Sequence, residues 1–358
     1  MLSSPEPVAA PVKVLVVDAD AASRCLLVQA LRGDTRLLVM HDVGNAQAVL
    51  DFLRTQRPDV VLMGDGSSGL DAFDTTRRIM ETQPLPIVLC VAPAEAGGAV
   101  FRSLEAGAVA CVGKPAAGMA AAERNAVIAR LQQTVRLMAE VKVVRRWSPA
   151  RSAATAARAA VRPGPRVVGI GASTGGPLVL QTILAELPRD FELPVLVVQH
   201  IARGFLPGMA DWLRQTSGLK VQVAAAGLMP QPGHVYLAPD DLHLGVDGAG
   251  RLALSRAAPE SGLRPAVACL FRSLAQVYGA DAIGVLLTGM GKDGAADLKT
   301  LKDQGAVTIV QDSASSVVHG MPGEAIALGA ATHVLPADRI AAMLVTLVRK
   351  AGRKEVAG

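Results

Sequence analysis

Short, continuously apolar runs rich in valine, isoleucine and leucine recur along the chain, and one segment with helical periodicity separates most of them from the next. Apolar runs without polar alternation predict strands buried on both faces, and a single intervening helix predicts parallel pairing. Before residue 115 the expected strands are Lys13–Val17, Leu37–Met40, Val60–Met63, Ile87–Val91 and Ala108–Val112. Five such units predict a small doubly wound, flavodoxin-like domain.

A second, larger series of the same kind begins after Arg166. Its expected strands are Val167–Ile170, Val195–Val198, Lys220–Ala224, Val235–Ala238, Ile283–Leu287, Thr308–Val310 and Thr332–Leu335. The turn-forming residues 247–250 between Leu242–Val246 and Leu252–Ser255 predict a β-hairpin. We therefore predict an α/β chain of two doubly wound, mostly parallel sheets, the second of them larger and Rossmann-like.

The two series imply a division of the chain into residues 1–118, residues 119–165 and residues 166–352. The middle part is expected to begin as a helix and to continue as an Ala/Arg/Pro-rich linker. Seven basic residues and no acidic one lie between residues 142 and 166, and removing them from the net charge of +5 leaves −2. This segment is interpreted as a solvated tether, with a docking surface as the alternative. Nucleic-acid binding is not expected, because Trp147 is its only aromatic residue.

Several functional classes are excluded by what the sequence lacks. No run approaches the roughly 20 apolar residues of a membrane-spanning helix, so no membrane insertion is expected. Residues 1–13 contain Pro and Glu where a signal peptide would be apolar, which predicts a cytoplasmic protein. The four cysteines, Cys25, Cys90, Cys111 and Cys269, lie far apart and are expected to be small, reduced core residues. No histidine spacing predicts a metal site, and no metal or cofactor is expected.

The turn after the first strand of the second series carries the sequence Gly-Ala-Ser-Thr-Gly-Gly over residues 171–176. Such a strand-to-helix turn exposes the hydroxyl of Ser173 at the carboxyl edge of the sheet, as in serine hydrolases. The same turn is equally consistent with an anion-binding loop in which Ser173 caps the helix. A dinucleotide site is disfavoured, because the third fingerprint position is Thr174 and no acidic residue ends the next strand.

Two further polar residues are expected at this edge of the sheet. His200 follows the second strand and is placed beside Ser173, where an imidazole would accept the serine proton. Asp293 lies in the Gly-rich turn after Ile283–Leu287, where it would orient that imidazole. The order Ser, His, Asp differs from that of α/β-hydrolases, so the chain is not assigned to that fold family.

Six segments together resemble the chemotaxis protein-glutamate methylesterases, the CheB family. They are IGASTGGP (170–177), VVQHIARGF (197–205), VYLAPDDLHL (235–244), RPAVACLFRSLA (264–275), LLTGMGKDGA (286–295) and QDSASSVVHGMP (311–322). They follow the family order and span nearly all of residues 166–350. Residues 1–118 are similar to the receiver domain of response regulators, which precedes the methylesterase domain in this family.

This resemblance implies roles for particular residues. Ser173 would be the nucleophile, His200 the general base and Asp293 its orienting acid. Thr174 would support the imidazole, and the backbone amide of Met290 would help to form the oxyanion hole.

The resemblance also implies the substrate. It would be a glutamate γ-methyl ester on the cytoplasmic helices of methyl-accepting chemoreceptors, with receptor glutamines deamidated in the same way. Arg203 and Arg264 are candidates for contacts to an acidic receptor surface, or are solvated charges at the rim. A chemosensory histidine kinase or scaffold is a further expected partner.

The receiver-like domain departs from its family at the phosphorylation site. Receivers carry an acidic pair after the first strand, which is Asp18 and Ala19 here, and a phosphoacceptor Asp at the position of Gly64. Val91 occupies the switch position, while Lys114 is retained. Phosphotransfer needs a carboxylate nucleophile and carboxylate-bound Mg²⁺, so we predict a pseudo-receiver without phosphorylation.

Three alternatives to these interpretations remain open at this point. Asp65 and Asp20 lie one position from the expected acidic sites, and together with Asp18 could rebuild a shifted pocket despite the change of strand face. The second series could also form a non-enzymatic anion-sensing regulator, or a serine hydrolase that acts on a different ester.

Overall fold

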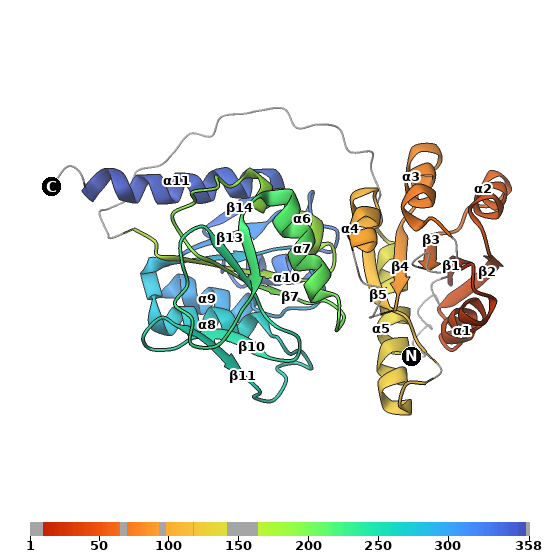
Figure 1. Cartoon of the computed structure of the whole chain (residues 1–358), viewed down its shortest axis with the longest axis horizontal. Coiled ribbons are helices and arrows are strands. Elements are labelled where there is room, and N and C mark those ends of the chain that lie inside the picture. The colour runs from red at the N-terminus through yellow and green to blue at the C-terminus, as the bar shows by residue number, and fades with distance from the viewer. Residues whose placement is uncertain (1–9, 65–69, 93–97, 117, 142–163, 356–358) are drawn as a thin grey trace, which may run out of the picture. The chain divides into compact units, whose positions relative to one another are not determined.

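The computed structural model of the chain describes residues 10–64, 70–92, 98–116, 118–141 and 164–355 (Figure 1). The chain divides into two compact units, Met1–Arg146 and Trp147–Gly358. Of the expected helix and linker, the part from residue 142 to residue 163 lies outside the described residues.

The N-terminal unit contains a five-stranded parallel sheet with the strand order β2-β1-β3-β4-β5. This is the predicted flavodoxin-like order. The strands are β1 (Val12–Val17), β2 (Leu37–Val43), β3 (Val60–Gly64), β4 (Ile87–Val91) and β5 (Ala110–Gly113). The helices are α1 (Ala21–Arg32), α2 (Ala46–Thr55), α3 (Ala72–Thr82), α4 (Gly98–Glu105) and α5 (Ala121–Ala139). Asp20, Asn45 and Asp71 begin the first three helices, because their side chains accept backbone N–H groups of the first turn.

The C-terminal unit contains a seven-stranded sheet with the order β14-β13-β12-β6-β7-β9-β8, parallel throughout. Its strands are β6 (Val167–Ala172), β7 (Val195–Gln199), β8 (Lys220–Val223), β9 (His234–Leu237), β12 (Ala282–Leu286), β13 (Val307–Gln311) and β14 (His333–Leu335). The predicted hairpin forms a separate two-stranded antiparallel sheet of β10 (His243–Val246) and β11 (Leu252–Ser255). The expected two-sheet α/β architecture is confirmed.

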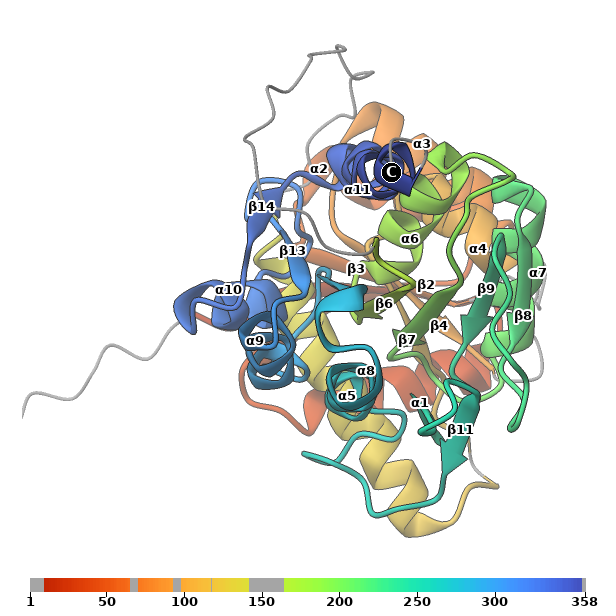
Figure 2. The ribbon, with the colours of Figure 1, turned by 90° about the vertical axis from the view of Figure 1, so that its left-hand side faces the viewer.

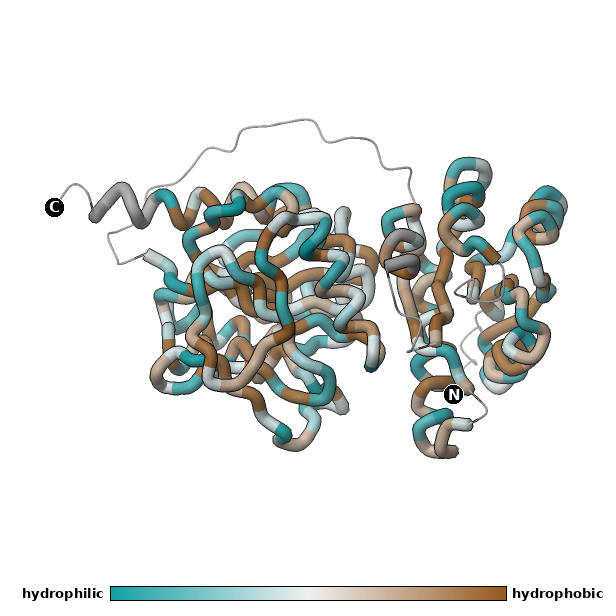
Figure 3. The backbone as a smooth tube through the Cα atoms, in the orientation of Figure 1, coloured by the Kyte–Doolittle hydropathy of each residue, from teal (hydrophilic) through white to brown (hydrophobic). Residues whose placement is uncertain are grey.

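Helices cover both faces of the larger sheet, as Figure 2 shows. One layer consists of α6 (Gly176–Glu186), α7 (Leu206–Ser217) and α11 (Ala337–Glu355). The other consists of α8 (Val267–Val277), α9 (Ala295–Asp303) and α10 (Gly320–Ala327), with the short 3₁₀ helix Gly279–Asp281 following α8. Apolar residues are concentrated along the strands, whereas apolar and polar residues alternate along helices such as α3 (Figure 3). This is the pattern expected of sheets buried on both faces.

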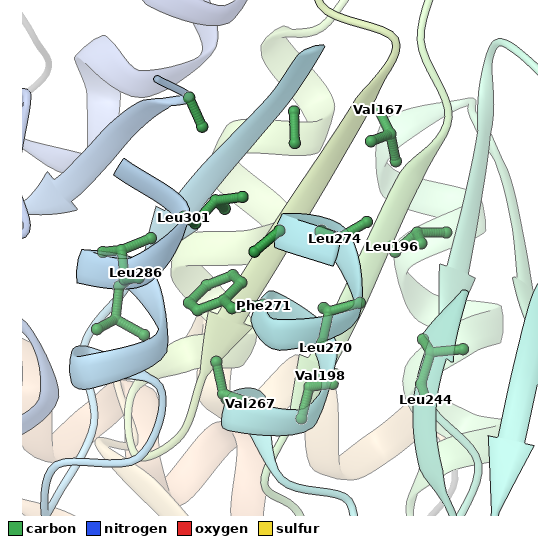
Figure 4. Close-up of a cluster of buried hydrophobic side chains, with 14 of the residues drawn as sticks. Val167, Leu196, Val198, Leu244, Val267, Leu270, Phe271, Leu274, Leu286 and Leu301 are labelled. Atoms are coloured by element: carbon green, nitrogen blue, oxygen red, sulfur yellow. The ribbon is translucent and has the colours of Figure 1, made fainter. Parts of the chain in front are cut away.

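The core beneath α8 fixes the position of that helix over the sheet. Leu270, Phe271 and Leu274 of α8 are fully buried against strand residues such as Leu196 and Leu286 (Figure 4). Truncating a buried phenylalanine to alanine typically destabilises a protein by about 3–5 kcal/mol. The N-terminus of α8 is therefore held rigidly at the carboxyl edge of the sheet.

The sheet order places its topological switch point at β6. From β6 the chain runs through β7 to β8 and β9 on one side, and later returns through β12 to β13 and β14 on the other. Ligands of open α/β sheets bind at the carboxyl ends of the strands at this point. The segments that follow β6, β7 and β12 therefore define the expected site.

One cysteine and the start of one helix differ from the sequence-based expectations. Cys25 is exposed and is not a core residue, because it lies on the outer face of α1. The sequence predicts a helix over residues 324–328, whereas α10 begins four residues earlier, at Gly320, although Gly320, Pro322 and Gly323 are weak helix formers. Among the described helices, none has a stretch long and apolar enough to cross a lipid bilayer.

Candidate active site

Ser173 lies immediately after β6, at the start of a tight turn. Its carbonyl oxygen accepts the N–H of Gly176 at 2.8 Å, and Gly175 between them has φ 79° and ψ −10°. These angles define the third position of a type II turn, which requires positive φ and hence favours glycine. The Ser173 N–H donates to the carbonyl of Thr288 after β12 at 3.0 Å. Ser173 is therefore fixed at the switch point, 8% exposed.

His200 lies beside Ser173 because the two strands that precede them are paired. Ala172 at the end of β6 is in register with Gln199 at the end of β7. The N–H of His200 continues that pairing with a 2.9 Å hydrogen bond to the Ala172 carbonyl. The next residues along the two strands are Ser173 and His200, as the sequence predicted.

The carboxylate of Asp293 contacts the imidazole of His200. His200 Nε2 lies 3.0 Å from Asp293 Oδ2, and both side chains are 5% exposed. The N–H groups of Val267 and Ala268, in the first turn of α8, donate to the Asp293 carboxylate at 2.7 and 3.0 Å. A helix N-terminus favours a negative charge, so α8 holds this carboxylate in place.

The contact between His200 and Asp293 is close but is not aligned as a hydrogen bond. Nε2 is a buried nitrogen without an aligned partner among the described residues. Catalytic hydrogen bonds are often loose in the absence of substrate and tighten when it binds.

The turn that carries Met290 packs directly against the serine turn. A Cβ at Gly289 would lie 2.7 Å from the Cβ of Ser173, so these two backbones approach as closely as glycine permits. Within the described part of the chain, the Met290 N–H has no acceptor. Thr174 receives a hydrogen bond at its carbonyl from Thr288 Oγ1 at 2.9 Å, and no described hydrogen bond joins its hydroxyl to His200.

Arg203 and Arg264 converge on one carboxylate, that of Asp241. Arg264 donates to it from Nε and Nη2 at 2.9 and 2.7 Å, and its Nη1 donates to two backbone carbonyls. Arg203 Nη2 lies 2.8 Å from the same oxygen of Asp241, with its side chain 74% exposed. The hydrogen bond from Arg264 lowers the pKa of Asp241. Arg264 is thus occupied within the fold, whereas Arg203 is accessible.

A second cluster of charged residues links α8 to Glu260, in the segment before the helix. Arg272 donates to Glu260 at 2.8 and 3.0 Å, and these hydrogen bonds, with one from Cys269, lower the pKa of Glu260 to about 2. Burial and the hydrogen bond to Glu260 raise the pKa of the Cys269 thiol to about 12. Cys269 therefore remains a thiol near neutral pH and is not a nucleophile.

Sequence reasoning missed the polar side chains that hold these turns together. Gln199, Thr288 and Gln311 are at most 5% exposed. Gln199 and Gln311 end β7 and β13, and Thr288 lies shortly after β12. Gln311 Oε1 accepts the Thr288 N–H at 2.7 Å, and Gln199 donates to the Ser173 carbonyl at 2.8 Å. A polar residue at or just after the end of a buried strand was the available signal.

In the N-terminal unit, Asp18 fills the pocket next to Gly64. Its Oδ2 accepts from Ser23 Oγ at 2.7 Å and lies 2.9 Å from Lys114 Nζ, while Oδ1 accepts the N–H of Asp20. A Cβ at Gly64 would lie 2.6 Å from the same Oδ2.

The alternative acidic pocket was expected to use Asp20 and Asp65. The carboxylate of Asp20 accepts the N–H groups of Ala22 and Ser23 and so caps α1, and Asp65 lies outside the described residues. Among the described residues, no group of three His, Cys, Asp or Glu side chains could hold a metal ion.

Comparison with known proteins agrees with this architecture. The response regulator receiver domain family matches residues 14–123, and the CheB methylesterase family matches residues 168–344. A protein-glutamate methylesterase/protein-glutamine glutaminase of Nitrosospira multiformis is 44% identical, covering 96% of this chain and 99% of the relative. A relative of the same name from Geobacter metallireducens is 48% identical, covering 94% of this chain and 99% of the relative.

The C-terminal unit also matches a solved structure. The crystal structure of the Thermotoga maritima CheB methylesterase catalytic domain is 41% identical, with a TM-score of 0.50, and covers 51% of this chain and 99% of that domain. These matches define a response-regulator-type protein with an enzymatic output domain. The chain belongs to the CheB family of protein-glutamate methylesterases, which confirms the resemblance seen in its sequence.

Proposed function

We propose that Ser173, His200 and Asp293 form the catalytic triad with which this chain hydrolyses glutamate γ-methyl esters of methyl-accepting chemoreceptors. As a member of its family, the chain is a protein-glutamate methylesterase and protein-glutamine glutaminase that acts in chemotaxis. The observation that carries the residue assignment is the 3.0 Å contact of His200 with Asp293, beside the serine that follows the neighbouring strand.

The reaction follows from these positions. Ser173 Oγ attacks the ester carbonyl carbon, and its proton passes to His200. Because Nε2 is the ring nitrogen that faces Asp293, Nδ1 is the nitrogen that accepts this proton. The tetrahedral intermediate collapses as the C–O bond to the methoxy group breaks, and the imidazolium returns the proton to release methanol.

The second half of the reaction repeats these steps with water. His200 takes a proton from water as the oxygen attacks the acyl-serine, and Ser173 leaves with the proton, which frees the glutamate. With a glutamine substrate the leaving group is ammonia, and the acyl-enzyme is the same. Asp293 balances the charge on the imidazolium at each stage.

The accessible Arg203 is proposed to contact acidic residues of the receptor, whereas Arg264 supports it through their shared partner Asp241. The receiver unit is proposed to dock a chemosensory kinase or scaffold in the cytoplasm, without itself being phosphorylated. An anion-sensing function is less well supported, because binding an anion at the serine turn makes no use of the buried His200–Asp293 contact.

The triad predicts a defined loss of activity. Ser173→Ala is expected to leave the protein folded and to reduce methanol release from methylated receptor by about 10³-fold or more. A serine-reactive fluorophosphonate should label Ser173 in the wild type, and His200→Ala should suppress that labelling.

Ser217 provides a matched control, because it is equally buried but donates within α7 to the carbonyl of Leu213. Ser217→Ala should retain labelling and activity. Near-normal methanol release by Ser173→Ala would rule out the serine mechanism, and an unlabelled but folded wild type would favour the anion sensor. Labelling without release of methanol from receptors would indicate a hydrolase of another ester.

A further inference from the structure

Gln199 is a buried polar residue whose side chain bridges two loops of the site. It ends β7 and is 5% exposed. Its Nε2 donates to the carbonyl of Ser173 at 2.8 Å and to the carbonyl of His200 at 2.9 Å. Both partners are carbonyl oxygens, so only the NH₂ end of the amide can face them. Both of its hydrogens are therefore used, one on the residue of the nucleophile and one on the residue of the base.

The hydrogen bond to Ser173 fixes the orientation of one peptide group. The Ser173 carbonyl is held by two donors, Gln199 Nε2 and the N–H of Gly176. A trans peptide is planar, so the N–H of Thr174 points opposite to this carbonyl. In the described part of the chain, the Thr174 N–H has no acceptor. It is thus a free donor in the residue after the nucleophile, where serine hydrolases hold an oxyanion.

The peptide before Met290 has the same construction. The Gly289 carbonyl accepts the N–H groups of Gly320 and Met321 at 3.1 and 2.9 Å. The Met290 N–H points the other way and is also free among the described residues. The two turns touch at Gly289 and Ser173, so both free donors belong to backbone that adjoins the nucleophile.

The other end of the Gln199 amide shows that this arrangement is not optimal for stability. Oε1 is buried without a hydrogen-bond partner among the described residues, which is unfavourable for a folded protein. A Cβ at Gly176 would lie 2.2 Å from Oε1, so the start of α6 leaves room for this amide only because it is glycine. Buried polar atoms left unpaired in this way call for an explanation beyond packing.

We propose that Gln199 is a positioning residue for the oxyanion hole. It holds the Ser173–Thr174 peptide so that the Thr174 N–H acts together with the Met290 N–H on the oxyanion. This inference rests on the proposed serine mechanism. Donors that are fixed before the reaction stabilise the charge that develops in the transition state more than they stabilise the bound ester. Gln199 therefore affects the chemical step and not substrate affinity.

The test uses the full chain with Gln199→Met, which preserves the length of the side chain and removes both donors. We expect kcat for methanol release from methylated receptor to fall about 10-fold to 100-fold, because loss of a single oxyanion donor lowers kcat by about 10²–10³. KM should change less than about threefold. An alkyl boronic acid forms a tetrahedral serine adduct with an oxygen in the oxyanion position, and its affinity should fall in proportion to kcat.

Thr308→Val is the matched control, since Thr308 is fully buried in β13 and donates to Ala330 away from the serine turn. It should lower thermal stability without changing the ratio of boronate affinity to KM. Gln199→Glu is a second variant with the same shape and at most one donor, and its kcat should also fall below that of the wild type.

The possible outcomes separate the two proposals. Folded Gln199 variants with unchanged kcat and boronate affinity would overturn the positioning role, while an active wild type would leave the triad intact. A rise in KM as large as the fall in boronate affinity would also overturn it, because the two changes together would indicate a general distortion of the site. Absence of boronate binding by the wild type would count against the serine mechanism itself.

Discussion

At position 64 the side chain that a phosphorylatable receiver carries would meet the carboxylate of Asp18. Asp18 occupies this space and is held by Ser23, by Lys114 and by a backbone N–H. A new carboxylate at position 64 would have to displace Asp18 from these partners, and overpacking of this kind typically destabilises by about 1–3 kcal/mol.

We therefore predict that Gly64→Asp alone lowers the melting temperature and accepts no stable phosphoryl group from acetyl phosphate. The double variant Ala19→Asp/Gly64→Asp is the matched comparison. It restores the acidic pair, so Mg²⁺ should stabilise it more than it stabilises Gly64→Asp. Phosphorylation of the single variant, with its stability unchanged, would contradict the idea of a filled pocket.

Residues that follow strands were predictable, and residues that act through the backbone were not. Ser173, His200 and Asp293 could be placed together because the ends of parallel strands meet at one edge of the sheet. The role of Gln199 depends on which carbonyl oxygens its amide reaches. That depends on the exact positions of the two strand ends, which the sequence does not give. Likewise, only the structure shows that Arg264 is bound to Asp241.

At the scale of elements, α10 contributes to the site through its first turn. The N–H groups of Gly320 and Met321 hold the Gly289 carbonyl and so fix the direction of the Met290 N–H. Sequence periodicity located only the second half of this helix, because packing against Gly289, and not helix propensity, stabilises its start.

This packing leads to a prediction about two glycines of α10. A Cβ at Gly320 would lie 2.9 Å from both Gly289 O and Gly291 N, whereas a Cβ at Gly323 would lie 3.2 Å from the movable ring of His319. Gly320→Ala should therefore displace the Met290 turn and lower kcat for methanol release by about 10-fold or more, with KM little changed.

Gly323→Ala is the control on the same helix and should retain most of the activity, because alanine favours helix formation and the His319 ring can shift. Circular dichroism and thermal unfolding show whether both variants fold. Equal activity of the two variants would mean that α10 does not orient the oxyanion donor.

At the scale of the whole molecule, the two units have kept different parts of their families' chemistry. The C-terminal unit places Ser173, His200 and Asp293 at one edge of its sheet, whereas the N-terminal unit keeps the receiver fold with Gly64 at the position of the acceptor carboxylate. The fold of a receiver depends on apolar strands, and these are intact, so the fold was predictable despite the change at the phosphoacceptor position. A phosphate-driven switch needs an input that favours one of two states, and Gly64 has no carboxylate to receive a phosphoryl group.

We therefore expect methylesterase activity of the full chain to be indifferent to phosphodonor. Acetyl phosphate with Mg²⁺ should change methanol release by less than about twofold, the small response expected when a ligand does not distinguish the two states. Stimulation that disappears in Asp65→Ala would instead show that a shifted acidic site has replaced the one at Gly64.

Deletion of residues 1–150 completes the experiment, because the C-terminal unit has its own core and its own complete sheet. A large rate increase on deletion, together with no response to phosphodonor, would identify the receiver unit as a constitutive inhibitor. An unchanged rate would leave docking to a partner as its role.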